Sequence, residues 1–147
     1  HQLPECKADE AQRYLAEGVD EIDMVCSIGA VRAGDWEQVF RDIRSVSALT
    51  RPAGVLLKVI LETCFLSDPQ IVSLVEACIE AQADFVKTST GFNGDGPRDP
   101  QLRLMLDTAN HRIQVKASGG IPTRERAREL RGARGRESEQ AEPEDPR

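Results

Sequence analysis

Three lysines that recur at a fixed interval constrain this chain more than any other sequence feature. Lys58, Lys87 and Lys116 follow one another at intervals of 29 residues, and each lies inside an apolar, strand-like run. Upstream, Asp23 occupies the same kind of setting, 35 residues before Lys58. A strand, a helix and two connecting loops take roughly 30 residues, so the interval is typical of consecutive strand–helix units. The spacing predicts four such units, each with one charged side chain at a corresponding point of its strand.

The run from Asp84 to Gly91 is the clearest of these strands. Alternation along a strand places Phe85, Lys87 and Ser89 on one face. A lysine on a buried face is costly unless its ammonium is paired or loses its proton. A lysine that reaches solvent at a strand end is the alternative interpretation. Because the arrangement recurs on the other strands, we favour a site at the strands' carboxyl ends.

The composition of the chain limits the kinds of partner that it can bind. The net charge of −6 supplies no basic face for nucleic acid, and no apolar run approaches the roughly 20 residues of a membrane span. The four cysteines (Cys6, Cys26, Cys64 and Cys78) show neither zinc-ligand spacing nor a disulfide framework. Cys26 and Cys64 are predicted near strand ends; lining a pocket is one interpretation, and we favour the other, that they are ordinary buried thiols. The start of the chain lacks the pattern of a signal peptide. These features predict a cytoplasmic protein that binds neither nucleic acid nor membranes.

Hydrophobic periodicity predicts strands alternating with helices. Residues 22–25, 55–61, 84–91 and 113–120 are the expected strand runs, and residues 7–17, 36–49, 68–83, 100–110 and 124–130 the expected helices. Residues 27–35 are expected to form a loop with a short turn, which ends at Asp35 as the N-cap of the next helix. Pro52 and Gly54 should end that helix, and Thr123 should cap the last one. The stretch 131–147 is too polar to bury a core and is expected to be a disordered, charged tail.

This order of elements predicts a parallel sheet covered by helices, formed by residues 1–130 as one domain. No GxGxxG turn or P-loop supports a nucleotide-binding fold. Polar side chains near the ends of several strands are typical of a (β/α)₈ barrel, the TIM barrel. Because that barrel takes about 250 residues, the expected α/β fold is a partial barrel with about four βα units.

The strand motifs carry a specific resemblance. Glu-Ile-Asp-Met-Val, Leu-Lys-Val-Ile-Leu-Glu-Thr, Asp-Phe-Val-Lys-Thr-Ser-Thr-Gly-Phe and Val-Lys-Ala-Ser-Gly-Gly-Ile together resemble the deoxyribose-phosphate aldolase family. The match covers roughly residues 4–130. It implies a class I aldolase, a carbon–carbon lyase with no metal ion or other cofactor. Its reaction is the reversible cleavage of 2-deoxyribose 5-phosphate to glyceraldehyde 3-phosphate and acetaldehyde, a step of deoxyribonucleotide catabolism.

The resemblance also assigns roles to residues. It implies that Lys87 is the Schiff-base lysine, that Lys116 takes part in proton transfer, and that Asp23 is the acid/base partner. Lys58 is given a supporting electrostatic role. The residues that the resemblance suggests for the substrate phosphate are Ser118, Gly119, Gly120, Thr90 and Gly91.

Elementary chemistry agrees with these roles. An amine attacks a carbonyl only when it is neutral, and both burial and the nearby charge of Lys116 favour the neutral form of Lys87. After carbon–carbon cleavage the enamine must be protonated by a positioned acid such as Asp23. A salt bridge from Asp23 to Lys58 or Lys116 is the structural alternative, and the two roles are compatible.

The match is incomplete at both ends. Strands that should precede residue 4 and the last two strands of the family are missing, and the charged tail stands where the barrel should continue. Three hypotheses therefore remain: an active aldolase that binds a small phosphorylated sugar, an inactive remnant or interaction module of that family, and a related Schiff-base aldolase with another substrate. Pairing of two copies into a homo-oligomer is a further expectation, since an opened barrel exposes sheet edges.

Overall fold

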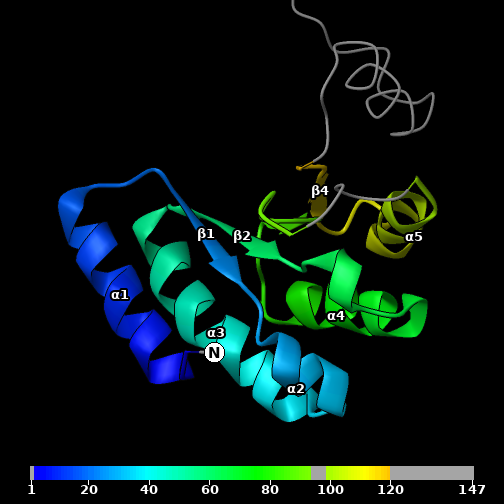
Figure 1. Cartoon of the computed structure of the whole chain (residues 1–147). Helices are drawn as coiled ribbons and strands as arrows, with labels where there is room; N and C mark the ends of the chain where they lie inside the picture. The colour runs from blue at the N-terminus through cyan, green and yellow to red at the C-terminus, as the bar shows by residue number, and fades with distance from the viewer. Residues whose placement is uncertain (1, 94–98, 120–147) are drawn as a thin grey trace, which may run out of the picture.

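Strands and helices alternate along the chain in the computed structural model, which describes residues 2–93 and 99–119 (Figure 1). The elements, in order, are α1 (Pro4–Glu17), β1 (Glu21–Val25), α2 (Ile28–Ala33), α3 (Trp36–Ala53), β2 (Leu56–Ile60), the 3₁₀ turn η1 (Thr63–Phe65), α4 (Asp68–Glu80), β3 (Phe85–Lys87), α5 (Asp99–Ala109) and β4 (Gln114–Lys116). The predicted alternation is confirmed. No helix in the described ranges is long and apolar enough to cross a membrane.

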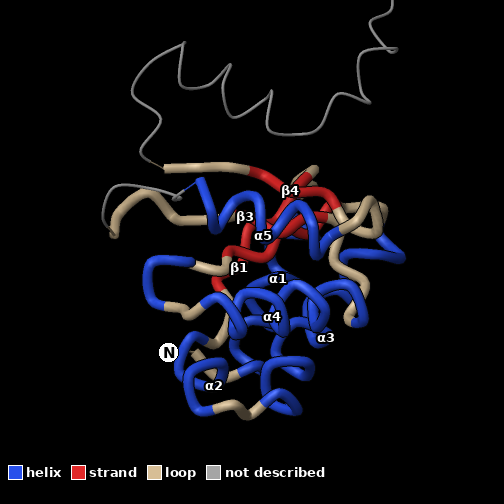
Figure 2. The backbone as a smooth tube through the Cα atoms, turned by 90° about the vertical axis from the view of Figure 1, so that its right-hand side faces the viewer, coloured by secondary structure: helices blue, strands red, loops and turns tan. Residues whose placement is uncertain are grey.

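The four strands form one parallel sheet in the order β1-β2-β3-β4. Helices α1, α2, α3 and α4 lie together on one side of the strands (Figure 2). The strand residues that point toward the helices are apolar and buried, namely Ile22, Met24, Leu57, Val59, Val86 and Val115. The other face of the sheet carries the charged residues Asp23, Lys58 and Lys87. In the described part of the chain no helix covers this face.

The register of the strands differs from the expectation that all four charged residues stand at corresponding points. Asp23 is the register partner of Lys58, and Lys87 is the partner of Lys116. Lys58, however, pairs with Phe85, two residues before Lys87. A shift of two residues keeps a side chain on the same face, because strand side chains alternate with period two. The charged residues therefore share a face but not a single row, as the stagger of a curved parallel sheet requires.

Helix boundaries follow local signals, but several differ from prediction: α1 begins three residues earlier, at Pro4, and α4 ends three residues earlier, at Glu80. The stretch 27–35, expected as a loop, contains the six-residue helix α2. Helix α3 begins at the predicted cap, where the Asp35 carboxylate accepts a hydrogen bond from the Gln38 N–H at 3.0 Å. It then runs beyond residue 49 to Ala53, with Pro52 in its last turn. The helix is terminated by Gly54, whose left-handed backbone (φ 69°) suits the residue after a helix.

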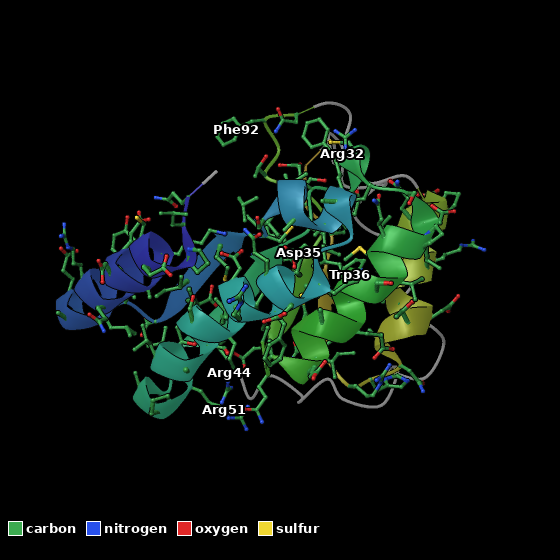
Figure 3. The ribbon with its side chains drawn as sticks, turned by 90° about the horizontal axis from the view of Figure 1, so that it is seen from below. Arg32, Asp35, Trp36, Arg44, Arg51 and Phe92 are labelled. Atoms are coloured by element: carbon green, nitrogen blue, oxygen red, sulfur yellow. The ribbon has the colours of Figure 1, made fainter. Side chains whose placement is uncertain are left out.

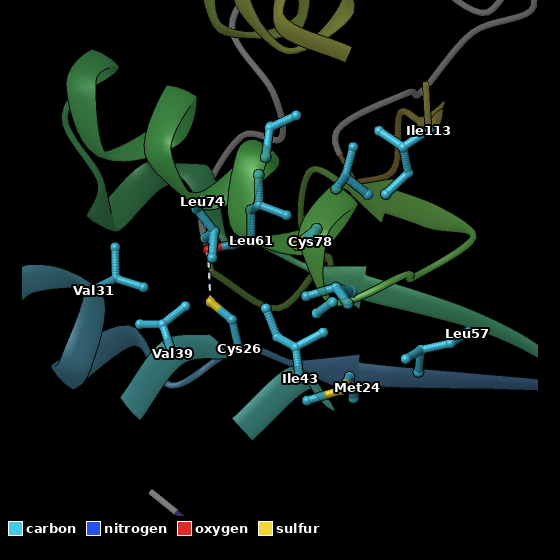
Figure 4. Packing of buried hydrophobic residues seen from close by; sticks show 14 of the residues in the cluster. Met24, Cys26, Val31, Val39, Ile43, Leu57, Leu61, Leu74, Cys78 and Ile113 are labelled. Atoms are coloured by element: carbon cyan, nitrogen blue, oxygen red, sulfur yellow. Dashed lines mark hydrogen bonds between the residues drawn. The ribbon is translucent and has the colours of Figure 1, made fainter. Parts of the chain in front are cut away.

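The core lies between the sheet and the helices (Figure 4). Its fully buried side chains come from both layers and include Val39, Ile43, Leu57, Val59, Leu61, Leu74, Val75 and Cys78. Cys26 belongs to this core, and its thiol donates to the Leu61 carbonyl at 3.6 Å. Cys26 is buried, 4% exposed, so the prediction of a buried thiol is confirmed there, and burial raises its pKa to about 12. For Cys64 the prediction is wrong, because η1 leaves that thiol exposed.

Three sequence predictions fall outside the described residues: the Thr123-capped helix, the charged tail at 131–147, and Gly120.

Candidate active site

Asp23 lies at the centre of the charged face, between two lysines from neighbouring strands. Its Oδ2 atom accepts a hydrogen bond from Lys87 Nζ at 2.6 Å. Its Oδ1 atom accepts one from Lys58 Nζ at 3.2 Å. One carboxylate thus joins β1, β2 and β3. The structure brings together three of the four charged residues that the sequence spacing singled out.

Lys58 is the most enclosed of these side chains, with 5% of its surface exposed. It pairs with Asp23 and with Glu21, which stands two residues earlier on the same face of β1. Its Nζ atom also lies 6.0 Å from the centroid of the Phe85 ring, a distance suited to a cation–π contact. Burial acts to lower the pKa of Lys58, but Glu21 and Asp23 outweigh it and raise that pKa above its ordinary value. Lys58 is therefore a fixed positive charge.

The two lysines also control the ionisation of Asp23. Partial burial acts to raise its pKa, but the hydrogen bonds and charges of Lys87 and Lys58 outweigh burial and hold the pKa below its usual range. The carboxylate is accordingly ionised near neutral pH. About a third of the Asp23 side chain, 34%, remains exposed, so a small molecule can reach it from the open face.

Lys87 is the last residue of β3, where a parallel strand opens onto its loop. Its backbone is fixed by the Leu61 N–H, which donates to the Lys87 carbonyl at 2.8 Å. Its side chain is only 14% exposed and ends on the Asp23 carboxylate. The structure thus holds a mostly enclosed primary amine within hydrogen-bond reach of a carboxylate, which can serve as the base that accepts its proton.

Lys116 stands apart from this cluster. Its backbone is beside Lys87 in the register of β3 and β4, as the spacing of the two lysines predicts. Its side chain is exposed, however, and forms no ion pair with any carboxylate in residues 2–93 and 99–119. Direct contact between Lys116 and the Asp23 carboxylate is therefore not part of this arrangement.

The residues suggested for phosphate binding divide into two kinds. Ser118 already uses its donors, its N–H on Thr88 Oγ1 at 2.9 Å and its hydroxyl on the Ser89 carbonyl at 2.5 Å. Thr90 gives both its N–H and its hydroxyl to one carboxylate, that of Glu62.

Gly91 and Gly119 are different, because neither N–H has a partner in the described part of the chain. Both have left-handed φ angles, 93° and 80°. Their backbones also approach closely, since a Cβ on Gly119 would lie 3.2 Å from the Gly91 Cα. Two free backbone donors close together are a suitable place for an anion.

Sequence reasoning missed two acidic residues of this region, Glu21 and Glu62. Glu21 is part of the first strand motif, but the sequence pattern assigned it no role. Glu62 follows β2 directly, and a polar residue at the carboxyl end of a buried strand was the available signal. In the described ranges, no three His, Cys, Asp or Glu side chains gather as ligands for a metal ion.

The sequence pattern of the DeoC/LacD family aldolases matches residues 1–139 of this chain. The chain belongs to that family. The lysines and the aspartate described above thus lie on the strands of a recognised aldolase framework.

Individual proteins that are similar to this chain support the same family assignment. The chain is 46% identical over 125 residues to a deoxyribose-phosphate aldolase of Mannheimia succiniciproducens, a match that covers 85% of this chain and 55% of that protein. It is 49% identical over 124 residues to one of Kocuria rhizophila, with 84% and 56% covered. The chain therefore spans about half the length of these aldolases.

Solved structures give the same result for the fold. A putative deoxyribose-phosphate aldolase from Coccidioides immitis superposes with a TM-score of 0.84 at 37% identity, covering 88% of this chain and 52% of that one. A tetrameric deoxyribose phosphate aldolase from Aeropyrum pernix gives a TM-score of 0.81 at 33% identity, with 90% and 56% covered. The expected fold class is confirmed: the α/β sheet corresponds to part of the TIM barrel of these family members.

Proposed function

We propose that this family member performs Schiff-base aldolase chemistry, the reversible cleavage of 2-deoxyribose 5-phosphate to glyceraldehyde 3-phosphate and acetaldehyde. The observation that carries the proposal is the contact of 2.6 Å between Lys87 Nζ and Asp23 Oδ2, at the carboxyl end of a barrel strand. That end is where TIM-barrel enzymes place their chemistry. The names of the similar aldolases support the choice of substrate.

In the proposed reaction Lys87 is the nucleophile. Once its proton has passed to Asp23 or to water, the neutral amine adds to the aldehyde carbon of the open-chain sugar. Loss of water from the adduct gives an iminium, which withdraws electrons from the bond between the second and third carbons. As Asp23 or a water molecule accepts the proton of the hydroxyl on the third carbon, that bond breaks, glyceraldehyde 3-phosphate leaves as the aldehyde, and an enamine remains on Lys87. Protonation of the enamine and addition of water then release acetaldehyde and regenerate the amine.

The remaining residues of the site have supporting roles in this proposal. Asp23 moves protons to and from the reacting carbon and nitrogen, directly or through a water molecule. Lys58 keeps Asp23 ionised and in place. Lys116, at the mouth of the site, assists proton transfer once the sugar lies between it and Lys87. The phosphate docks on the N–H groups of Gly91 and Gly119, with Ser118 and Thr90 shaping the surrounding loops.

A second candidate is an inactive remnant or interaction module of the family. One observation favours it: Lys116 stands outside the Asp23 cluster. Cytoplasmic location and a role in deoxyribonucleotide catabolism stay predictions under either candidate.

Trapping with borohydride distinguishes the two candidates. The chain has four lysines, so peptide mapping after reduction assigns an adduct without ambiguity. We expect deoxyribose 5-phosphate or acetaldehyde, with borohydride, to add one reduced adduct on Lys87. Lys87→Ala should abolish the adduct, and Lys116→Leu should slow its formation by about tenfold or more.

The control is circular dichroism on the same samples. A folded wild-type chain that forms no adduct on Lys87 would rule out the active-enzyme proposal and leave the inactive candidate. An adduct spread over several lysines would show ordinary surface amines rather than a built site.

A further inference from the structure

Glu62 is a buried acid that the proposed reaction does not use. It follows β2 directly and its surface is 1% exposed. Its backbone is left-handed, with φ 53° and ψ 61°, a conformation that a non-glycine residue adopts at an energetic cost. Such backbone geometry is concentrated at functional sites, where the surrounding structure enforces it.

The Glu62 carboxylate is bound by the loop that follows β3. Both oxygens accept from the Thr90 N–H at 3.2 Å, and Oε2 accepts from the Thr90 hydroxyl at 2.5 Å. Oε2 also accepts from the Asn93 side-chain amide at 3.4 Å. All these contacts come from one short segment, residues 90–93, that begins three positions after Lys87.

No cation shares this carboxylate in the described part of the chain, where Glu62 forms no ion pair with Lys, Arg or His. A buried carboxylate without water is stable only when hydrogen-bond donors replace the water it has lost. The donors of residues 90–93 must therefore stay in place for Glu62 to stay buried. The carboxylate and the loop fix each other.

Neighbouring contacts show what this arrangement holds. On either side of Glu62, the N–H groups of Leu61 and Thr63 donate to the carbonyls of Lys87 and Thr88, at 2.8 and 3.0 Å. From the opposite side, the Ser118 hydroxyl holds the Ser89 carbonyl. The loop after β3 is thus held between the loops after β2 and β4, and Glu62 is the side chain that holds its distal part.

We propose that Glu62 is a positioning residue, which fixes residues 90–93 so that the Gly91 N–H stays beside Gly119 for the substrate phosphate. The inference rests on the proposed function of the site, and it makes Glu62 a determinant of preference for phosphorylated over free sugars. Because both donors of Thr90 serve Glu62, the anion is left to the free glycine N–H groups.

The test compares Glu62→Gln with Asp42→Asn. Glutamine keeps the shape of the side chain but turns an amide donor toward the Thr90 and Asn93 donors. Asp42, the matched control, is a second fully buried carboxylate; it pairs with Lys7 on the helical side of the sheet. Both variants remove a buried negative charge, so any loss specific to the loop after β3 must come from Glu62.

Two readouts are measured on the whole chain. In Glu62→Gln, hydrogen exchange at the Thr90 amide should accelerate about tenfold or more, while the Leu61 amide keeps its wild-type rate. The half-saturating concentration for borohydride trapping at Lys87 should rise about tenfold for deoxyribose 5-phosphate. For unphosphorylated deoxyribose it should stay within about twofold. Asp42→Asn should leave both readouts within about twofold of wild type.

The two proposals fail separately. If the wild-type chain traps no sugar, the proposed function fails, and exchange at Thr90 still decides whether Glu62 positions the loop. If Glu62→Gln leaves Thr90 exchange unchanged, or raises half-saturation equally for both sugars, the positioning role is overturned. A loss in Asp42→Asn that equals the loss in Glu62→Gln overturns it as well, because the effect is then general destabilisation.

Discussion

At the scale of single residues, Asp23 decides how the charged face behaves. It is the acceptor for both Lys58 and Lys87, and these contacts keep its pKa below the ordinary carboxyl value against the opposing effect of burial. A group whose pKa falls on folding stabilises the protein above its unfolded-state pKa, and this contribution disappears as the pH falls through the folded-state value. Lowering the pH should therefore reduce the stability that this cluster contributes to the fold.

Asp23→Asn tests the pH dependence. We expect the wild type to lose more unfolding free energy than the variant as the pH falls from about 5 to below the ordinary carboxyl pKa of about 3.9. Urea denaturation at each pH gives the two curves. Their separation should shrink in a Lys87→Met background, because one of the two charges that lower the pKa is then absent. Parallel curves for wild type and variant would contradict the assignment.

Part of the site was predictable at this scale and part was not. The strand motifs placed Asp23, Lys58 and Lys87 on one face, since alternation and spacing are local properties of the chain. Glu62 was not predicted, because its partners lie 28 and 31 residues further on and depend on the left-handed turn after β2. The exposure of the Lys116 side chain could not be predicted either. The alternation of residues tells which face of a strand a side chain is on, but not whether other parts of the chain cover that face.

At the scale of elements, the Lys7 side chain connects helix α1 both to helix α3 and to the sheet. Lys7 of α1 donates to Asp42 of α3 at 2.6 Å and to the Val25 carbonyl, at the end of β1, at 2.8 Å. The strands and helices themselves were predictable from periodicity and caps. This connection was not, because it joins residues 35 positions apart and neither residue belongs to a recognisable motif.

Lys7→Met should cost about 3 kcal/mol of unfolding free energy, because it leaves the Asp42 carboxylate buried without its cation. The double variant Lys7→Met/Asp42→Leu should recover most of that loss, since no unpaired charge remains. Chemical denaturation of the single and double variants measures both values. If the double variant is as unstable as the single one, packing rather than charge is the reason.

At the scale of the whole molecule, β1 is an edge strand in the described structure, paired with β2 alone. A cavity of about 490 Å³ runs beside it, and its lining includes Tyr14, Met24 and Ile28. The exposed aromatic ring of Phe92 extends from the loop after β3, away from the helices (Figure 3). Open edges and exposed apolar groups favour association.

We expect the chain to associate reversibly as its concentration rises, with β1 as the contact. Val25→Pro should weaken association: the Cys26 N–H bonds to the Ile60 carbonyl of β2, so alternation points the Val25 N–H outward. Sedimentation velocity over a range of concentrations measures this. A wild-type chain that stays monomeric throughout, or a variant that associates equally, would exclude β1 as the contact.

The four-member cluster of Glu21, Asp23, Lys58 and Lys87 is formally electroneutral, with two carboxylates and two ammonium groups. An iminium carries the same unit charge as the ammonium it replaces. Conversion of Lys87 from one to the other, as proposed, therefore leaves the charge of the cluster unchanged. Formation of the covalent intermediate from a neutral aldehyde should consequently depend little on ionic strength, whereas docking of the phosphate should weaken as salt increases.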